Sequence, residues 1–264
     1  MRRPPYLPFL EGPPDFVVGL RPIPLGNWLA PDVEADWLPE KRALLRDRTT
    51  EVFAQTPGSE AAQKEAAALV GAARTLLEAA SLVSDDLCIM QERDGVWTLT
   101  AAALCAPSFW SLAENIGGPL AHLHGPVPDR LGADGTQGLA QRIGRMFSAL
   151  QPDTILERFN WTIQASAARF TPDGGPLRAR AATARAEDAL DLLHVRVERQ
   201  TIRKLPQTGA VLFTIRVSTD PLRAVFAVDG AKQALARGWR EAPEHVRAYK
   251  KWAAYEPLMQ AALN

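Results

Sequence analysis

The stretch from His194 to Val217, HVRVERQTIRKLPQTGAVLFTIRV, places the tightest constraint on what this chain can fold into. Its first half alternates valine with charged and polar residues, and its second half is almost wholly apolar. Such alternation is typical of a strand with one buried face. The intervening LPQTGA contains proline and glycine, the residues that favour turns. We therefore predict an antiparallel hairpin here.

The hairpin register follows from a four-residue connection in which Leu205 faces Ala210. Counting back along both strands places Arg199 directly opposite Arg216. Because side chains repeat every second residue along a strand, Arg203 lies on the same face as Arg199. The sequence thus predicts three guanidinium groups on one face of a two-stranded ribbon.

Like charges directly opposite each other destabilise a β-ladder. An anion between Arg199 and Arg216 would reverse the sign, because a guanidinium binds carboxylate or phosphate through two parallel hydrogen bonds. The alternative is a solvated sheet face on which Glu157 and Glu198 are the partners. The sequence leaves both interpretations open.

The remaining pattern predicts an α+β chain. Helices, two strands, a helical crossing segment, three strands and further helices follow one another, which is the order of a PAS-like antiparallel five-stranded sheet with helical insertions and additional N- and C-terminal helices. The predicted elements are a proline-rich arm over 1–40, helices over 41–55 and 59–83, a hairpin around Arg93-Asp94-Gly95, a helix over 138–151, a strand over 155–166, a long loop over 171–188 and helices over 229–238 and 243–262.

This order divides the chain into an N-terminal arm with helices (1–82), a PAS-like core (83–225) and C-terminal helices (226–264), packed as one unit. The formal net charge of zero excludes the overall basic character of most nucleic-acid binders. No apolar run has the length of a membrane span. Cys88 and Cys105 form neither a disulfide framework nor a CxxC metal motif, and we expect both to be buried in a cytoplasmic protein.

The four histidines offer one further kind of site. His122 and His124 lie in PLAHLHGPVP, before a proline-stiffened turn, while His194 begins the basic strand and His245 lies near the C-terminus. Zinc needs three or four protein ligands, and no cluster here supplies them. Haem needs only one axial histidine, because the porphyrin provides four nitrogens. His124 is the preferred axial ligand and His194 is the alternative.

At this point the residues resemble a known family. The hairpin, together with GLRPIPLGNWLAPD, EKRALL, LCAPSFWSLAENIGGPLAHLHGPVP and RFNWTI in the same order, is similar to the haem-dependent oxidative N-demethylase alpha-subunit-like family. The similarity extends from Gly19 to Leu222, and the hairpin is its most specific part.

The resemblance implies a PAS-like fold that binds haem b. It implies a monooxygenase that uses dioxygen to demethylate a small methylated amine such as dimethylamine, with release of formaldehyde. Electrons would come from NADPH through a separate reductase that carries FMN and an iron–sulfur cluster, and a folate-binding subunit could capture the formaldehyde. The alternatives are a haem-PAS sensor of gas or redox state and a PAS-like interaction subunit without catalysis.

On this mapping, Arg199, Arg203 and Arg216 would bind the haem propionates and His124 would hold the iron. Glu198 could attract an ammonium substrate as a catalytic residue. Because Glu198 lies on the strand face opposite Arg199, however, pairing with Arg196 is favoured.

The sequence departs from the family pattern in two places. Asp129-Arg130 follows HGPVP, where an aromatic residue is common, and Lys204 replaces an arginine. The first departure leaves the identity of the substrate open.

Overall fold

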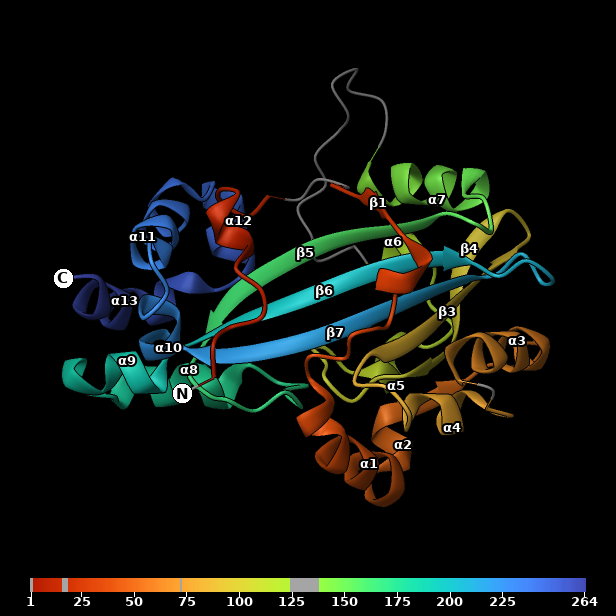
Figure 1. Cartoon of the computed structure of the whole chain (residues 1–264), viewed down its shortest axis with the longest axis horizontal. Coiled ribbons are helices and arrows are strands. Elements are labelled where there is room, and N and C mark those ends of the chain that lie inside the picture. Colours follow the sequence, from red (N-terminus) through yellow and green to blue (C-terminus); the bar gives the residue numbers. More distant parts are fainter. Residues whose placement is uncertain (1, 16–18, 72, 124–137) are drawn as a thin grey trace.

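The computed structural model describes residues 2–15, 19–71, 73–123 and 138–264. These residues form an α+β fold around an open seven-stranded sheet in the order β1-β5-β6-β7-β3-β4-β2, with every neighbouring pair antiparallel (Figure 1). The strands are β1 (Arg21–Ile23), β2 (Phe53–Gln55), β3 (Asp86–Arg93), β4 (Val96–Ala103), β5 (Ile155–Gln164), β6 (His194–Lys204) and β7 (Val211–Pro221).

The hairpin of β6 and β7 confirms the predicted register. The Leu205 N–H donates to the Ala210 carbonyl over 2.7 Å, and Arg199 pairs with Arg216 across the ladder. Strands β5, β6 and β7 are long and lie side by side through the middle of the molecule (Figure 1). They carry Arg199 and Arg216 on one face and Glu198 on the other.

A buried carboxylate on a neighbouring helix holds the hairpin loop. Glu65 accepts hydrogen bonds from the backbone N–H groups of Gln207, over 2.6 Å, and Thr208, over 2.9 Å, and from the Thr208 hydroxyl over 2.7 Å. The loop therefore has a fixed position relative to α3, although its own residues are exposed.

The prediction of five strands is corrected to seven among the described residues. The two additional strands, β1 and β2, come from segments predicted as an extended arm and a helix, and they pair at opposite edges of the sheet. Both are short, and short edge strands carry little periodicity in the sequence.

The described helices are α1 (Leu38–Asp47), α2 (Thr49–Val52), α3 (Glu60–Gly71), α4 (Leu76–Ala80), α5 (Leu112–Asn115), α6 (Leu120–Leu123), α7 (Leu139–Ala149), α8 (Gly175–Thr183), α9 (Ala189–Leu192), α10 (Leu222–Phe226), α11 (Ala231–Glu241), α12 (Glu244–Tyr249) and α13 (Glu256–Leu263). The helix over 138–151 is confirmed as α7. None of the described helices is long and apolar enough to cross a bilayer.

Three helix predictions and one loop prediction are corrected. The helix over 243–262 is divided into α12 and α13 by a 3-10 turn at Trp252–Tyr255. The helix over 41–55 begins earlier, breaks at Arg48 and ends in β2. The helix over 59–83 is divided into α3 and α4, because the Thr75 hydroxyl accepts the Glu78 N–H and begins a new helix. The loop over 171–188 contains α8, where Pro176 occupies the first turn, a position that needs no N–H donor.

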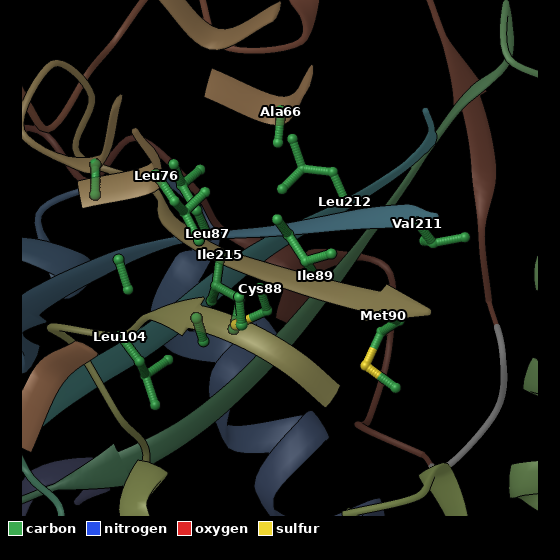
Figure 2. Packing of buried hydrophobic residues seen from close by; sticks show 14 of the residues in the cluster. Ala66, Leu76, Leu87, Cys88, Ile89, Met90, Leu104, Val211, Leu212 and Ile215 are labelled. Atoms are coloured by element: carbon green, nitrogen blue, oxygen red, sulfur yellow. The ribbon is translucent and has the colours of Figure 1, made fainter. Parts of the chain in front are cut away.

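The two faces of the sheet are named here by the neighbouring residues Arg199 and Glu198, which point in opposite directions. On the Arg199 face, Leu87 and Ile89 of β3 and Leu212 of β7 pack toward Ala66 of α3 and Leu76 of α4 (Figure 2). The C-terminal helices cover the other end of this face, where a second apolar cluster forms. Residues 27–31 of the arm cover its centre.

Helix α7 covers one end of the Glu198 face. Trp97 of β4 contacts the Phe147 ring edge-on, with centroids 5.3 Å apart, and donates its indole N–H to Ser148 over 3.1 Å. Strand β1 pairs with β5 only at Ile155–Ile23, Leu156–Pro22 and Glu157–Arg21, so the rest of the β5 edge is accessible to other segments.

Replacing Glu65 with alanine leaves two N–H groups of the hairpin loop without an acceptor. We expect the free energy of unfolding to fall by about 1–3 kcal/mol, measured by urea denaturation. Lys64→Ala, at the exposed neighbouring position of the same helix, is the control and should change stability by less than about 0.5 kcal/mol. Equal effects of the two substitutions would contradict the role of Glu65.

Candidate functional site

The arginine pair of the hairpin is buried and bound by groups of the chain itself. Arg199 donates through Nε to Glu157 over 2.6 Å and through its two terminal nitrogens to the Trp28 and Asn27 carbonyls over 2.7 and 2.6 Å. Arg216 has the same arrangement with different partners. It donates to Asp85 over 2.8 and 2.6 Å and to the Pro31 and Leu29 carbonyls over 2.7 and 2.6 Å.

These contacts explain how Arg199 and Arg216 can lie opposite each other in the ladder despite their like charges. Asp85 and Glu157 neutralise the two guanidinium groups, and Glu157 is the partner expected in the alternative interpretation. The face is not solvated, however, because Arg199 and Arg216 are only 6% and 1% exposed. Assignment of these two arginines to haem propionates stays a prediction, since every one of their side-chain nitrogens already has an internal acceptor.

Arg203 differs from the pair. Its guanidinium lies over the Trp28 ring, 4.6 Å from the ring centroid, and Nε has no hydrogen-bond acceptor among the described residues. The Trp28 indole in turn donates to Thr201 over 3.0 Å. Arg203 thus fixes the arm by stacking and keeps a nitrogen that an anion could use.

The Glu198 face carries a compact polar group that we call the polar quartet: Arg158, Asn160, Glu198 and Gln200. Strand register places Arg158 opposite Gln200 and Asn160 opposite Glu198, so the four side chains form a square on adjacent strands. All four are half-buried, whereas the residues beside Arg199 on the other face are buried. On β7, the neighbours of the quartet are the buried side chains of Ile215 and Val217.

Glu198 is the centre of the quartet. Its carboxylate accepts hydrogen bonds from the Ser108 hydroxyl, from Gln200 over 2.8 Å and from Asn160 over 3.2 Å. Burial alone would raise the pKa of Glu198, but the Arg196 charge and these hydrogen bonds outweigh it and lower the pKa. Glu198 is therefore an anion at neutral pH.

The expected Glu198–Arg196 pair forms no direct hydrogen bond among the described residues; Ser108 lies between the two, accepting from Arg196 Nε over 2.9 Å and donating to Glu198. The other Arg196 donors bind neutral acceptors, among them the Ala106 carbonyl at 2.7 Å and the Arg169 carbonyl at 3.1 Å. Burial among neutral groups lowers the Arg196 pKa to about 10.

Two further cations lie at the quartet. Burial lowers the pKa of Arg158, and its Nε is enclosed without an acceptor among the described residues. Lys250 reaches the quartet from the turn after α12, across the open edge of β5, and donates to Asn160 over 2.8 Å. Burial lowers the pKa of Lys250 to about 8.

The predicted axial ligands have different positions. His124 lies outside the described residues. His194 is buried at the start of β6, on the Glu198 face, and its Nδ1 is 3.0 Å from the Leu192 carbonyl. Burial lowers the pKa of His194, which keeps the imidazole neutral and Nε2 available as a ligand. His122 is exposed on α6, and His245 lies 3.5 Å from Asp15.

The expected burial of both cysteines is confirmed, and burial raises the pKa of each thiol. The part of the chain with described positions contains no cluster of three or more metal-ligating His, Cys, Asp and Glu side chains. A cavity of about 110 Å³ lies between α2 and α5, and another of about 420 Å³ lies beside Arg2 and Asp229. Neither is lined by a histidine or by a member of the quartet.

Sequence reasoning missed Arg158, Asn160 and Lys250. The first two stand at alternate positions of the RFNWTI strand, so their common face was available from periodicity once their pairing with Glu198 was known. Lys250 had no such signal, because only the three-dimensional path of the C-terminal segment brings it to β5.

The ion pair of Arg216 and Asp85 gives a stability prediction. Asp85→Ala leaves the guanidinium buried without its carboxylate, so we expect the free energy of unfolding to fall by about 3–5 kcal/mol in urea denaturation. The Asp85→Leu, Arg216→Met double variant should recover most of the loss.

Asp47→Ala, in the exposed Arg46–Asp47 pair, is the matched control and should cost less than about 1 kcal/mol. If Asp85→Ala also lowered the free energy of unfolding by less than about 1 kcal/mol, the buried pair would not be holding the arm.

Lys250 gives a pH prediction. Its folded pKa of about 8 lies below its usual value of 10.5, so above pH 8 the unfolded chain binds a proton that the folded chain has lost. The stability of the natural protein relative to Lys250→Met should therefore rise between pH 8 and pH 10.5. Urea denaturation of both proteins at several pH values measures the difference, and a constant difference would show that the Lys250 pKa is not lowered.

The chain was also compared with known protein families. A family model described as "Haem-dependent oxidative N-demethylase, alpha subunit-like" matches residues 71–259, well over half of the chain. The matched region contains the hairpin, the polar quartet and Lys250. This protein belongs to the haem-dependent oxidative N-demethylase alpha-subunit-like family.

Proposed function

We propose that this protein is the haem-binding catalytic subunit of a cytoplasmic, oxygen-dependent oxidative N-demethylase that acts on a small methylated amine, such as dimethylamine, and releases formaldehyde. Membership of the family over residues 71–259 is the observation that carries the proposal. The family name supports haem dependence and an oxidative enzyme. The substrate class is the one that the family resemblance implies.

We further propose that the central five strands, in the order β4-β3-β7-β6-β5, form a PAS-like core. The position of the inserted helices supports this assignment. Helices α5, α6 and α7 are inserted between the second and third strands of this core, as the sequence order predicts. The edge strands β1 and β2 are then additions made by the N-terminal segment.

His194 and Arg203 could not both contact one haem, because they lie on opposite faces of the sheet. The Arg199 face is an unfavourable place, since residues 27–31 cover its centre and the donors of Arg199 and Arg216 are engaged. The Glu198 face fits haem better. It offers the buried Nε of Arg158, which has no acceptor among the described residues.

On this placement His124 or His194 would be the axial ligand, and Arg158 would lie toward the acidic edge of the macrocycle. When bound, haem would supply the iron at which dioxygen is activated. The chain contributes the surrounding charges. Glu198 stays anionic because Arg196, Ser108 and Asn160 lower its pKa, so it can offer a negative charge to an ammonium group.

The electrons must come from outside this chain on this proposal. Both cysteines are buried and separate in sequence, and the sequence has no dinucleotide-binding glycine motif. A partner reductase with FMN and an iron–sulfur cluster, using NADPH, would meet this need, and a folate-binding partner could accept the formaldehyde. The "alpha subunit-like" description of the family agrees with an enzyme of several subunits.

The first test is the absorbance spectrum of the purified full chain with haem b. We expect a Soret band, because a histidine ligand and an apolar surface are available. His124→Ala and His194→Ala then identify the ligand, since loss or shift of the band should occur in one variant and not in the other. Absence of any band in the natural protein would contradict the proposal.

The second readout is formaldehyde release from dimethylamine in the presence of dioxygen and a competent reductase. Release that requires all three components would support the enzyme. A stable Soret band without formaldehyde from any small methylamine would instead support the gas or redox sensor.

A further inference from the structure

Arg158 and Lys250 form an unusual pair on the Glu198 face. No described residue accepts a hydrogen bond from the Arg158 guanidinium, and its Nε is enclosed. The Lys250 ammonium donates to Asn160 Oδ1, a neutral acceptor, over 2.8 Å. Two cations thus lie at the same half-buried polar quartet without a carboxylate bonded to either one.

Glu198 alone cannot balance all of these charges. Its carboxylate is held by Ser108, Asn160 and Gln200, and it is already the acidic counterpart of Arg196. Among the described residues, Glu198 is the one acidic group whose charge raises the pKa of Arg158 and of Lys250. One carboxylate therefore faces three cations.

Positive charges enclosed in this way are costly unless an anion pairs with them. A guanidinium and an ammonium together bind a carboxylate well, through charge-assisted hydrogen bonds. A singly charged group suits the site better than phosphate, because Glu198 in the same quartet repels additional negative charge. On β7, the buried side chains of Ile215 and Val217 border the quartet, so the surroundings of the site are partly apolar.

We propose that Arg158 and Lys250 together form a binding site for the carboxylate of a ligand with an apolar or N-methylated body. Two sources have this chemistry: a propionate of haem, or the carboxylate of an N-methyl amino acid that serves as substrate. In either case the bound carboxylate supplies a second negative charge beside Glu198 for the three cations Arg158, Arg196 and Lys250.

This inference deepens the proposed function and rests on it only for the choice of these two sources. Arg158→Gln and Lys250→Gln remove one charge each at similar size, and Arg158→Lys keeps the charge but loses the planar donor set. Arg237→Gln, at an exposed position of α11, is the matched control. Circular dichroism and the thermal midpoint establish that each variant is folded.

The full chain purified without added haem is titrated with haem b, with the dimethyl ester of haem b, which lacks carboxylates, and with N-methylglycine and dimethylamine. Soret absorbance reports the first two ligands and calorimetry the others. If the source is a propionate, Arg158→Gln and Lys250→Gln should each lower the affinity for haem b by about tenfold or more and leave the affinity for the ester unchanged. Arg158→Lys should retain part of the affinity.

If the source is a substrate, the same variants should lower the affinity for N-methylglycine by a similar factor. The affinities for haem b and dimethylamine should not change. Unchanged affinities for both haem b and N-methylglycine in folded variants would overturn the proposal. A natural protein that binds neither haem b nor N-methylglycine would overturn it as well. Failure of the proposed function gives a different result. A carboxylate ligand would still bind in a way that depends on Arg158, but no formaldehyde would be released, and the site would stand without the function.

Discussion

The capture of two opposed guanidinium groups by buried carboxylates and by carbonyls of the arm organises this molecule. Arg199 and Arg216 would repel each other across the ladder, but Glu157 and Asp85 each hold one of them. Their remaining donors bind four carbonyls between residues 27 and 31. The N-terminal segment is thereby held over the centre of the sheet on the Arg199 face, and the polar quartet lies on the opposite face.

The two faces therefore have separate tasks, although their residues alternate along the same strands. Every odd position from Arg199 to Arg203 contributes to holding the arm, and the even positions Glu198 and Gln200 contribute to the polar quartet. A single sequence motif thus encodes a structural interface on one side and a candidate site on the other. This division explains why a highly specific hairpin motif need not consist of ligand-binding residues throughout.

The sequence predicted the hairpin, its register, α7 and the α+β class, because each depends on local periodicity and turn chemistry. It could not predict that Asp85 neutralises Arg216, since that carboxylate is distant in sequence and directly precedes β3, the strand that pairs with β7 from another part of the chain. The short edge strands and α8 were missed for a related reason. Tertiary pairing forms the former, and a proline in a helical first turn resembles a loop when seen in sequence alone.

The quartet is assembled from parts made at different times during synthesis. Ser108 belongs to the segment after β4, Asn160 and Glu198 to successive strands, and Lys250 to the turn after α12. A ribosome that has completed both strands of the hairpin has not yet added the lysine. The strands of the central sheet are therefore all synthesised before the lysine that completes the contacts of the quartet.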